Sequence, residues 1–255
     1  MPTTIIKIPF DKCIVEKDRR GAALGPDQIE KELKNFFEFE EGLARKTKFL
    51  EVKEVSDFEK MHKEAESLAV NEYKKGNLVV GLGGDHSVSY GLMRAFAKVH
   101  KKAGLIFIDA HLDCQDDFLP PTHEDILRAA VKEKLFSEII AIGTRNFTEK
   151  EKDFAESHKI NFSKEIDYKK IMNLCEKVEN IYISLDIDAI DPAFAPGTGW
   201  PEPLGLMPQQ VMALLEFLKA TKKVRGFDIV EVSPPKDVNN ITSRLAARLL
   251  IELIK

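Results

Sequence analysis

The sequence predicts an α/β protein with a mainly parallel β-sheet and helices on both of its faces. Short apolar runs, of the length expected for buried strands, alternate along the chain with longer segments whose apolar residues recur at helical spacing. Two parallel strands need a crossover connection, usually a helix, so this alternation indicates a parallel sheet. Acidic and imidazole side chains directly follow several of the apolar runs, at the strand ends where open parallel sheets bind ligands. We therefore expect a three-layer α/β/α fold.

The expected elements follow one another in a regular order. Pro26, behind a glycine turn, is placed to open a helix, because its fixed φ angle suits the first helical turn. No change of composition marks a linker, so we expect one domain over residues 1–255. Strands are expected at 5–8, 48–55, 78–82, within 105–113, and at 138–142, 181–188 and 224–230. Helices are expected from Pro26 into Phe37, at 58–73, 89–101, 126–134, 149–158, 168–178 and 208–220, and after Asn239.

Composition and charge narrow the function classes. The chain has 255 residues, 44% of them apolar, which is enough for one large core. Its net charge of −4 offers no general attraction for nucleic acid or for an anionic membrane. The N-terminus shows no signal or transit pattern, and no stretch approaches the ~18 apolar residues of a membrane span, so we expect a cytoplasmic location. Cys13, Cys114 and Cys175 have no paired spacing and are expected to be reduced bystanders.

Two stretches, LIFIDAHLD and IYISLDID, each end a buried apolar run with metal-binding side chains at two-residue spacing. Side chains two residues apart in an extended chain point the same way, so each stretch is expected to turn its ligands towards one face. We interpret the two stretches as strand ends that face one metal centre. The ligands are Asp109, His111 and Asp113 in the first stretch and Asp186 and Asp188 in the second.

Two further apolar runs end in possible ligands. GLGGDHS supplies Asp85 and His86, and the last strand supplies Asp228 and leads to Glu231. One such Asp could be only a helix cap, but capping does not explain ligands at four strand ends. Asp228 could support a metal-bound imidazole or be a plain strand-end residue. The glycines of GLGGDHS do not form a dinucleotide loop, because the third glycine of that fingerprint and a phosphate-binding Lys are missing.

The ligand types indicate the kind of metal centre. Burying four carboxylates at one site is prohibitive unless cations compensate them, and two dications would neutralise four Asp side chains. Oxygen ligands mixed with imidazole, without a thiolate pair, favour Mn²⁺ over a structural zinc. Two such ions roughly 3.5–4 Å apart could share a water, lower its pKa and hold it as hydroxide for attack on a polarised carbon. The residues therefore predict a hydrolase.

Three motifs carry a resemblance to a known family. GGDHS at 83–87, DAHLD at 109–113 and SLDIDAIDPAFAPGTG at 184–199 resemble, in order and spacing, the signatures of the ureohydrolase family, which includes arginase, agmatinase and formimidoylglutamase. GAALGPDQI and DIVEVSPP also look like family segments. The resemblance covers most of the chain and implies an arginase-like α/β/α fold, a binuclear manganese centre and a homo-trimer or homo-hexamer.

The resemblance also implies which residues hold each ion. Two carboxylates, those of Asp109 and Asp186, would bridge the pair. The first Mn²⁺ is implied to bind His86, Asp109, Asp113 and Asp186. The second is implied to bind His111, Asp109, Asp186 and Asp188.

Three residues outside the metal ligands acquire roles from the resemblance. Glu231 looks like the family's guanidinium-binding carboxylate, and a planar cation suits such a bidentate acceptor. His123, in the loop PPTHED, sits where the family places a proton-shuttling histidine. Agmatinase-like members typically read PGTGTPEPGG, whereas this chain reads PGTGWPEPLG, so Trp200 replaces a small residue in a loop expected to border the pocket. Trp200 could reshape the pocket or present a cation–π face to an amine.

Departures from the family pattern bear on the substrate. Arginase typically has an Asn just after DAHxD to recognise the α-amino acid end, and Cys114-Gln115 does not reproduce it. This favours hydrolysis of agmatine to putrescine and urea, a step of polyamine biosynthesis, with no nucleic acid or membrane partner. Arginase, formimidoylglutamase and guanidino-acid hydrolase activities stay open. More remote alternatives are a deacetylase-like amidohydrolase with one zinc and a metal-binding homologue without activity.

Overall fold

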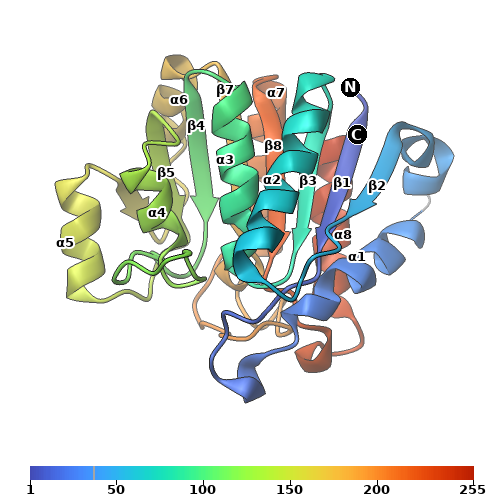
Figure 1. Cartoon of the computed structure of the whole chain (residues 1–255), viewed down its shortest axis with the longest axis horizontal. Coiled ribbons are helices and arrows are strands. Elements are labelled where there is room, and N and C mark those ends of the chain that lie inside the picture. Colours follow the sequence, from blue (N-terminus) through green and yellow to red (C-terminus); the bar gives the residue numbers. More distant parts are fainter. Residues whose placement is uncertain (37) are drawn as a thin grey trace.

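The structure, a computed structural model, describes residues 1–36 and 38–255 and is built on one parallel sheet (Figure 1). Among the described residues the sheet has eight strands in the order β2-β1-β3-β8-β7-β4-β5-β6, and every pair is parallel. The strands are β1 (Thr3–Ile8), β2 (Thr47–Glu51), β3 (Leu78–Gly83), β4 (Ala103–Ile108), β5 (Glu138–Ile142), β6 (Asn161–Ser163), β7 (Asn180–Asp186) and β8 (Val224–Val230).

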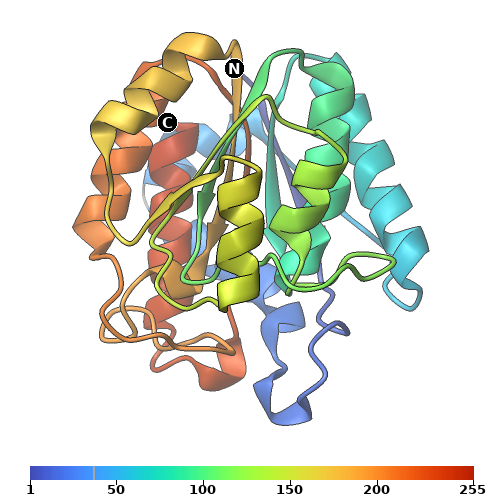
Figure 2. The same ribbon diagram turned by 90° about the vertical axis from the view of Figure 1, so that its left-hand side faces the viewer.

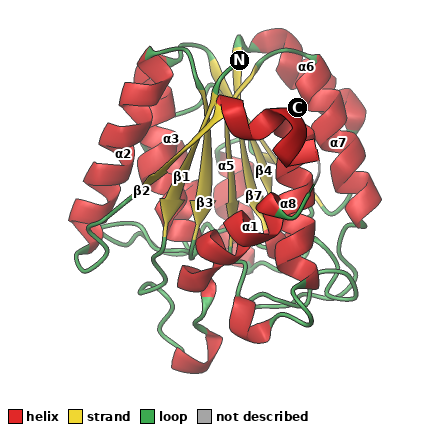
Figure 3. Ribbon diagram, turned by 90° about the vertical axis from the view of Figure 1, so that its right-hand side faces the viewer, coloured by secondary structure: helices red, strands yellow, loops and turns green. Residues whose placement is uncertain are grey.

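Helices cover both faces of the sheet, which Figure 3 shows nearly edge-on between two helical layers. One face packs against α1, α6, α7 and α8, and the other against α2, α3, α4 and α5. None of the helices in the described chain is both long and apolar enough to cross a bilayer. The helices are α1 (Gly25–Lys34), α2 (Phe58–Lys74), α3 (Ser89–Val99), α4 (Ile126–Lys132), α5 (Glu149–Ser157), α6 (Tyr168–Lys177), α7 (Pro208–Ala220) and α8 (Ile241–Ile254).

The apolar side chains of the central strand β4 pack into the hydrophobic cores on both faces of the sheet. Leu105 and Phe107 pack with the layer that contains α2 and α3, whereas Ile106 and Ile108 pack with the layer that contains α7 and α8. All four side chains are fully buried. A strand covered on both faces needs an apolar residue at every position, which explains why the sequence shows a continuous run there and no alternation.

One expected strand is shorter than its sequence pattern suggested. β2 ends at Glu51, although apolar residues continue to 55. The backbone N–H groups of Lys53 and Glu54 donate to the side chain of Glu64 on α2 and not to a neighbouring strand. Pairing with β1 therefore stops where a helix side chain takes over the backbone donors.

Two other differences concern element ends and the sheet edge. α1 begins at Gly25 and ends at Lys34, short of the expected end at Phe37, which lies outside the described residues. The edge strand β6 was not expected at all. Three residues, partly exposed, carry too short a pattern to be recognised from sequence.

The fold brings four strand ends together near the middle of the sheet. β3, β8, β7 and β4 are neighbours there, although β3 and β8 are far apart in the chain. Their carboxyl ends point to the lower edge in Figure 1, where the longer loops gather. Figure 2 shows the same loops below the sheet, with α5 in front of the β6 edge. Ligands of an open parallel sheet bind at this edge.

Candidate metal centre and active site

The six expected metal ligands lie together at the carboxyl ends of β3, β4 and β7, but not for the reason that strand alternation suggested. β4 ends at Ile108, so Asp109 and the residues after it belong to a loop, in which Asp113 has a left-handed backbone (φ 47°). Asp186 is the last residue of β7, and Asp188 lies in a short 3-10 turn beyond it. Apart from Asp186, turns after the strands, and not continued strands, therefore orient the ligands.

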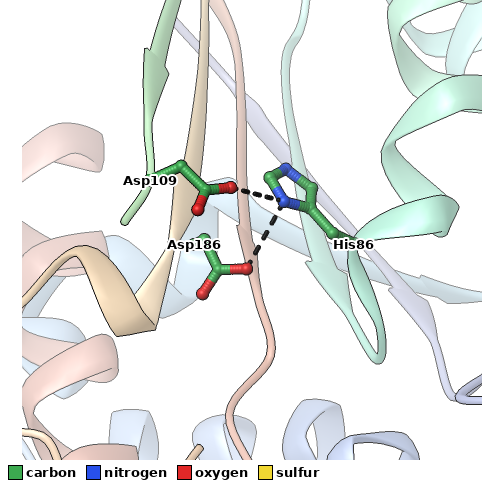
Figure 4. A group of neighbouring side chains, drawn as sticks. All are labelled: His86, Asp109 and Asp186. Atoms are coloured by element: carbon green, nitrogen blue, oxygen red, sulfur yellow. Dashed lines mark ion pairs between the residues drawn. The ribbon is translucent and has the colours of Figure 1, made fainter. Parts of the chain in front are cut away.

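His86 is the centre of a first group of ligands. Its Nδ1 lies 2.9 Å from Oδ2 of Asp109, 3.1 Å from Oδ2 of Asp113 and 3.4 Å from Oδ2 of Asp186. Figure 4 shows the carboxylates of Asp109 and Asp186 turned towards this one ring nitrogen. All four side chains are buried. One imidazole and three carboxylates thus converge on a common point.

His111 is the centre of a second group. Its Nδ1 lies 3.0 Å from Oδ2 of Asp188 and 3.5 Å from Oδ1 of Asp109. Asp109 therefore contributes one oxygen to each group, as expected of a bridging carboxylate. Asp186 lies with the first group, beside His86.

Backbone amides hold the carboxylates in place. Asp109 Oδ1 accepts from the N–H of His111 at 2.7 Å, and Asp186 Oδ1 accepts from the N–H of Asp188 at 2.8 Å. Asp188 Oδ1 accepts from the N–H of Ala110 at 3.2 Å, which ties the loop after β7 to the loop after β4. These bonds fix the orientation of each carboxylate without using the oxygens nearest His86.

The side chains of the two groups are better suited to binding a pair of cations than to hydrogen-bonding with one another. Nδ1 of His86 and Oδ2 of Asp109 are buried and close, yet neither has a hydrogen bond of suitable geometry within the described part of the chain. Burial raises the pKa of Asp186, and the charges of Asp188 and Asp109 add to the effect. Burial, with Asp109, also raises the pKa of Asp113 to about 8. Such a surplus of buried negative charge is what divalent cations would compensate.

Ser184 and Asp228 support His86 from the side opposite the ligands. His86 Nε2 lies 3.0 Å from Oγ of Ser184, and the Ser184 hydroxyl donates to Oδ1 of Asp228 at 2.7 Å. Because that hydroxyl donates to Asp228, its oxygen is left to accept the Nε2 proton of His86, which leaves Nδ1 free to bind a cation. Asp228 thus acts through Ser184, one of the two roles that the sequence left open. Ser184 was missed, since a serine inside an apolar strand carries no signal of its own.

Glu202 lies beside the second imidazole and was not expected there. Its Oε1 lies 3.6 Å from Nε2 of His111 and accepts from the amide Nδ2 of Asn146 at 2.8 Å. Arg145 fixes the same loop, because its guanidinium donates to the backbone oxygens of Glu202 and Asp188. The sequence motif around Glu202 was interpreted only as a pocket border, so its contact with His111 needed the fold.

Glu231 sits beside the first group with one oxygen unused. Its Oε1 accepts from the backbone N–H of His86 at 2.8 Å, whereas Oε2 is buried and has no hydrogen-bond partner among the described residues. Burial raises the pKa of Glu231 above its usual range, and nearby Asp85 adds to the effect. The backbone of Glu231 is left-handed (φ 62°), so this carboxylate is aimed by a turn immediately after β8.

A pocket of about 260 Å³ opens onto the ligands, and the other expected site residues line it. His123 and Trp200 stack there, with ring centroids 5.3 Å apart, and Nδ1 of His123 is buried without a partner inside the described chain. Burial lowers the pKa of His123 to about 4. Arg19 lies over the Trp200 ring and donates to the carbonyl of Gly199 at 2.8 Å, so the N-terminal segment closes on the Trp200 loop.

The remaining wall comes from the loop after β4 and from the start of α5. Gln115, Thr148 and Glu151 lie on it. Sequence reasoning noted Gln115 only as a departure from the arginase pattern and did not consider Thr148 or Glu151. Thr148 and Glu151 form a capping box, whose T-x-x-E pattern could have located the start of α5 but not its place beside the pocket. Cys114 is fully buried, with a pKa raised by burial and by Asp113, and is not among the residues that line the pocket.

The fold and the site together define an α/β/α protein with a candidate dinuclear metal centre at the carboxyl edge of a parallel sheet. The model of the Arginase family matches residues 2–255, and the chain belongs to this family. The resemblance inferred from the three motifs and the expected α/β/α fold are both confirmed.

Similar proteins carry names that describe action on guanidino compounds. The guanidinobutyrase of Pseudomonas aeruginosa is 37% identical over 209 residues, which cover 75% of this chain and 65% of that protein. The mitochondrial guanidino acid hydrolase of Homo sapiens is 36% identical over 193 residues, covering 70% of this chain and 54% of that one. The chain thus spans between about half and two thirds of these two relatives. The solved agmatine ureohydrolase of Thermoplasma volcanium is 33% identical with a TM-score of 0.84, over 99% of this chain and 88% of that one.

Proposed function

We propose that the protein is a hydrolase that cleaves a C–N bond of a guanidino compound at a centre of two Mn²⁺ ions. The observation that carries the proposal is the place of Glu231, whose Oε2 is buried and unpaired at the side of the pocket next to His86. A buried carboxylate oxygen without a donor suits a guanidinium group, which is planar and permanently charged. Membership of the Arginase family supports the same reaction class.

We assign different roles to the metal ligands and to two residues of the pocket. We assign one ion to His86, Asp109, Asp113 and Asp186, and the other to His111, Asp109, Asp186 and Asp188. When bound, the ions supply an activated water as the nucleophile. Glu231 holds the guanidinium so that its carbon faces that nucleophile. His123, neutral near pH 7 because burial lowers its pKa to about 4, can accept a proton and then deliver it to the leaving amine nitrogen.

Agmatine is the proposed substrate. Of the described residues that line the pocket none is a Lys or an Arg, whereas Glu124 and Glu151 add negative charge beyond the metal ligands and Glu231. Agmatine ends in an amine, which is positively charged at neutral pH, and this charge suits an acidic wall. A substrate that ends in a carboxylate would meet like charges there.

A guanidino acid, such as 4-guanidinobutyrate, is the second candidate. It is favoured by the names of the two curated relatives, a guanidinobutyrase and a guanidino acid hydrolase, at 37% and 36% identity. The amide of Asn146 on the pocket wall donates one proton to Glu202, and its second proton can be donated to a carboxylate end. The acidic residues on the rest of the pocket wall argue against a guanidino acid as the substrate.

A substrate panel tests the proposal. The protein is loaded with Mn²⁺ and incubated with agmatine, arginine, 4-guanidinobutyrate, formimidoylglutamate and N-acetylputrescine, and urea, formamide and acetate are measured. We expect urea, fastest from agmatine. Glu231→Gln, which keeps the shape but removes the charge, should keep the metal content and lose most of the urea. If arginine is hydrolysed much faster than agmatine, agmatine is not the substrate. If no guanidino compound releases urea, the proposed reaction class is wrong.

We propose a homo-trimer or homo-hexamer, as the family resemblance implies. Large apolar side chains on the loops are consistent with an interface: Leu119 is 96% exposed and Val15 80%. Light scattering of the purified protein would measure the mass, and a monomer at micromolar concentration would contradict the assembly.

A further inference from the structure

The guanidinium of Arg19 contacts two consecutive residues of the loop that borders the pocket. Its Nη1 donates to the carbonyl oxygen of Gly199 at 2.8 Å, and its central carbon lies 5.6 Å from the centre of the Trp200 ring. Trp200 lines the pocket, whereas Arg19 is not one of the described residues that line it. Arg19 therefore contacts this part of the wall from outside the pocket.

The same two loop residues also lie beside the groups that we assign to the reaction. The ring of Trp200 stacks on that of His123, with centroids 5.3 Å apart. Gly199 has no side chain, and a Cβ at this position would lie 3.1 Å from the carbonyl oxygen of Arg19 and 3.9 Å from Oε2 of Glu231. The backbone at 199 is therefore close both to the N-terminal segment and to the oxygen that we assign to the guanidinium of the substrate.

Among residues 1–36 and 38–255, no carboxylate forms an ion pair with Arg19, and the carbonyl of Gly199 is the one acceptor of its side chain. A guanidinium group can stack on an aromatic face and donate hydrogen bonds in its own plane at the same time. The contacts of the Arg19 guanidinium in the described chain are therefore with one loop, the loop that carries Trp200.

Arg19 belongs to a loop whose ends are held together. Oδ2 of Asp11 accepts from the backbone N–H of Gly21 at 2.9 Å, and Nε of Arg20 donates to the carbonyl oxygen of Ile14 at 2.7 Å. Both hydrogen bonds cross the loop. A loop ordered in this way loses little further freedom when its arginine contacts the indole, so more of the contact energy is left to hold the indole in place.

We propose that Arg19 is a positioning residue of the proposed reaction, which holds Trp200 against His123 from outside the pocket. This inference rests on the proposed function and adds to it a role for the N-terminal segment. The chain itself, and not a substrate amine, supplies the cation over the Trp200 ring. Without Arg19 the indole is free to leave the imidazole, and the proposed proton-transfer group loses the ring that stacks on it.

Trp200 is the single tryptophan of the chain, so its fluorescence reports on the contact without any substrate. Quenching by acrylamide is measured on the Mn²⁺-loaded protein. Arg19→Met, which keeps a long side chain but removes the guanidinium, should increase the quenching and shift the emission to longer wavelength, because water then reaches the indole. Arg19→Lys keeps a cation and should give a smaller increase. The exposed Arg45 provides the matched control, Arg45→Met, which should leave the quenching at the wild-type level.

Steady-state kinetics separates positioning from a general loss of structure. With the guanidino compound that is hydrolysed fastest, Arg19→Met should lower kcat by about 10-fold, because a small displacement of a reacting group is costly. KM should stay near the wild-type value, because Glu231 keeps its hydrogen bond to the backbone N–H of His86. In a Trp200→Thr background there is no indole to hold, so Arg19→Met should then have little effect on kcat.

Two results would overturn the proposal: equal quenching in Arg19→Met and Arg45→Met, or the same loss of kcat from Arg19→Met with and without the indole of Trp200. If circular dichroism shows that Arg19→Met is misfolded, Arg19→Lys is compared with Arg45→Lys and decides in the same way. Absence of urea from every guanidino compound would instead reject the proposed function. Quenching needs no substrate, so it would still decide whether Arg19 holds Trp200.

Discussion

The indole of Trp200 stacks on the imidazole of His123, with ring centroids 5.3 Å apart and an angle of 29° between the ring planes. Trp200 is the single tryptophan of the chain and stands where the resembling agmatinase motif has a small residue. Burial lowers the pKa of His123 to about 4. The departure from the family motif therefore places an aromatic ring against the proposed proton-transfer group as well as at the border of the pocket.

Trp200→Thr should raise the pKa of His123. Removing the indole admits water to the imidazole, which makes the protonated form less costly, so the pKa should move from about 4 towards the ordinary value near 6.5. NMR titration of the His123 ring protons, assigned by their loss in His123→Asn, measures the shift. A pKa that stays near 4 in Trp200→Thr would show that Trp200 is not what buries the histidine.

His123→Asn should slow turnover without loss of metal. The asparagine cannot carry a proton between the nucleophile and the leaving amine, and proton transfer of this kind contributes about 10²- to 10⁴-fold. Among the described residues His123 does not belong to the groups centred on His86 and His111, so the metal content should stay at the wild-type level. Steady-state urea release and elemental analysis measure the two quantities. A wild-type rate would remove His123 from the proposed mechanism.

Asp109→Asn and Asp188→Asn should have different effects on metal content. Asp109 contributes an oxygen to each ligand group, so its replacement should weaken binding of both ions, whereas Asp188 belongs only to the group centred on His111. We expect Asp109→Asn to retain less than one ion per chain and Asp188→Asn about one. Elemental analysis after dialysis against Mn²⁺ measures the ratio. Equal loss in both variants would contradict the shared role of Asp109.

That the six proposed metal ligands lie together could be predicted from sequence, because short motifs set both the type and the spacing of these side chains. Asp109 and His111 are two residues apart, and a turn after a buried strand keeps them together whether or not the strand continues. The expected mechanism of alignment was nevertheless wrong, since β4 stops at Ile108. Local patterns thus located the groups correctly while misjudging the backbone that carries them.

The supporting contacts could not be predicted, because each joins residues that only the fold brings together. Ser184 meets Asp228 through the register of β7 and β8, which no local pattern encodes. Gln115 meets Glu151 because the loop after β4 lies against the start of α5. Pairing of this kind is decided by tertiary packing, so it appears only in the structure.

Glu202→Ala should weaken metal binding although Glu202 is not a proposed ligand. Its Oε1 lies 3.6 Å from Nε2 of His111 and favours the tautomer that leaves Nδ1 free for a cation. Loss of such a partner typically costs about 10- to 100-fold in metal affinity. Calorimetric titration with Mn²⁺ measures it, with the exposed Glu216→Ala on α7 as the matched control. The same affinity in Glu202→Ala as in the control would show that His111 does not need the carboxylate.

His62→Phe should make the stability of the protein less sensitive to acid. His62 on α2 is only 5% exposed, with its ring between Phe58 and Tyr90 and both ring nitrogens without partners among the described residues. Burial, and then the charge of Arg94, lowers its pKa to about 4. The unfolded chain, with a histidine pKa near 6.5, therefore binds more protons than the folded chain between these two values.

Neutral His62 therefore contributes to the free energy of unfolding in full above about pH 6.5. This contribution, on the order of 3 kcal/mol, is lost as the pH falls towards 4. Phenylalanine fills the same aromatic site and does not titrate, so this part of the pH dependence should disappear. Urea unfolding of the metal-free protein at pH 7 and pH 4.5 measures it as a difference between variants. The exposed His158→Phe serves as the control, because it makes the same substitution at a histidine on the protein surface. The prediction fails if His62→Phe loses as much stability on acidification as that control does. His62 would then take up its proton as readily in the folded protein as in the unfolded chain, and its burial between α2 and α3 would not lower its pKa.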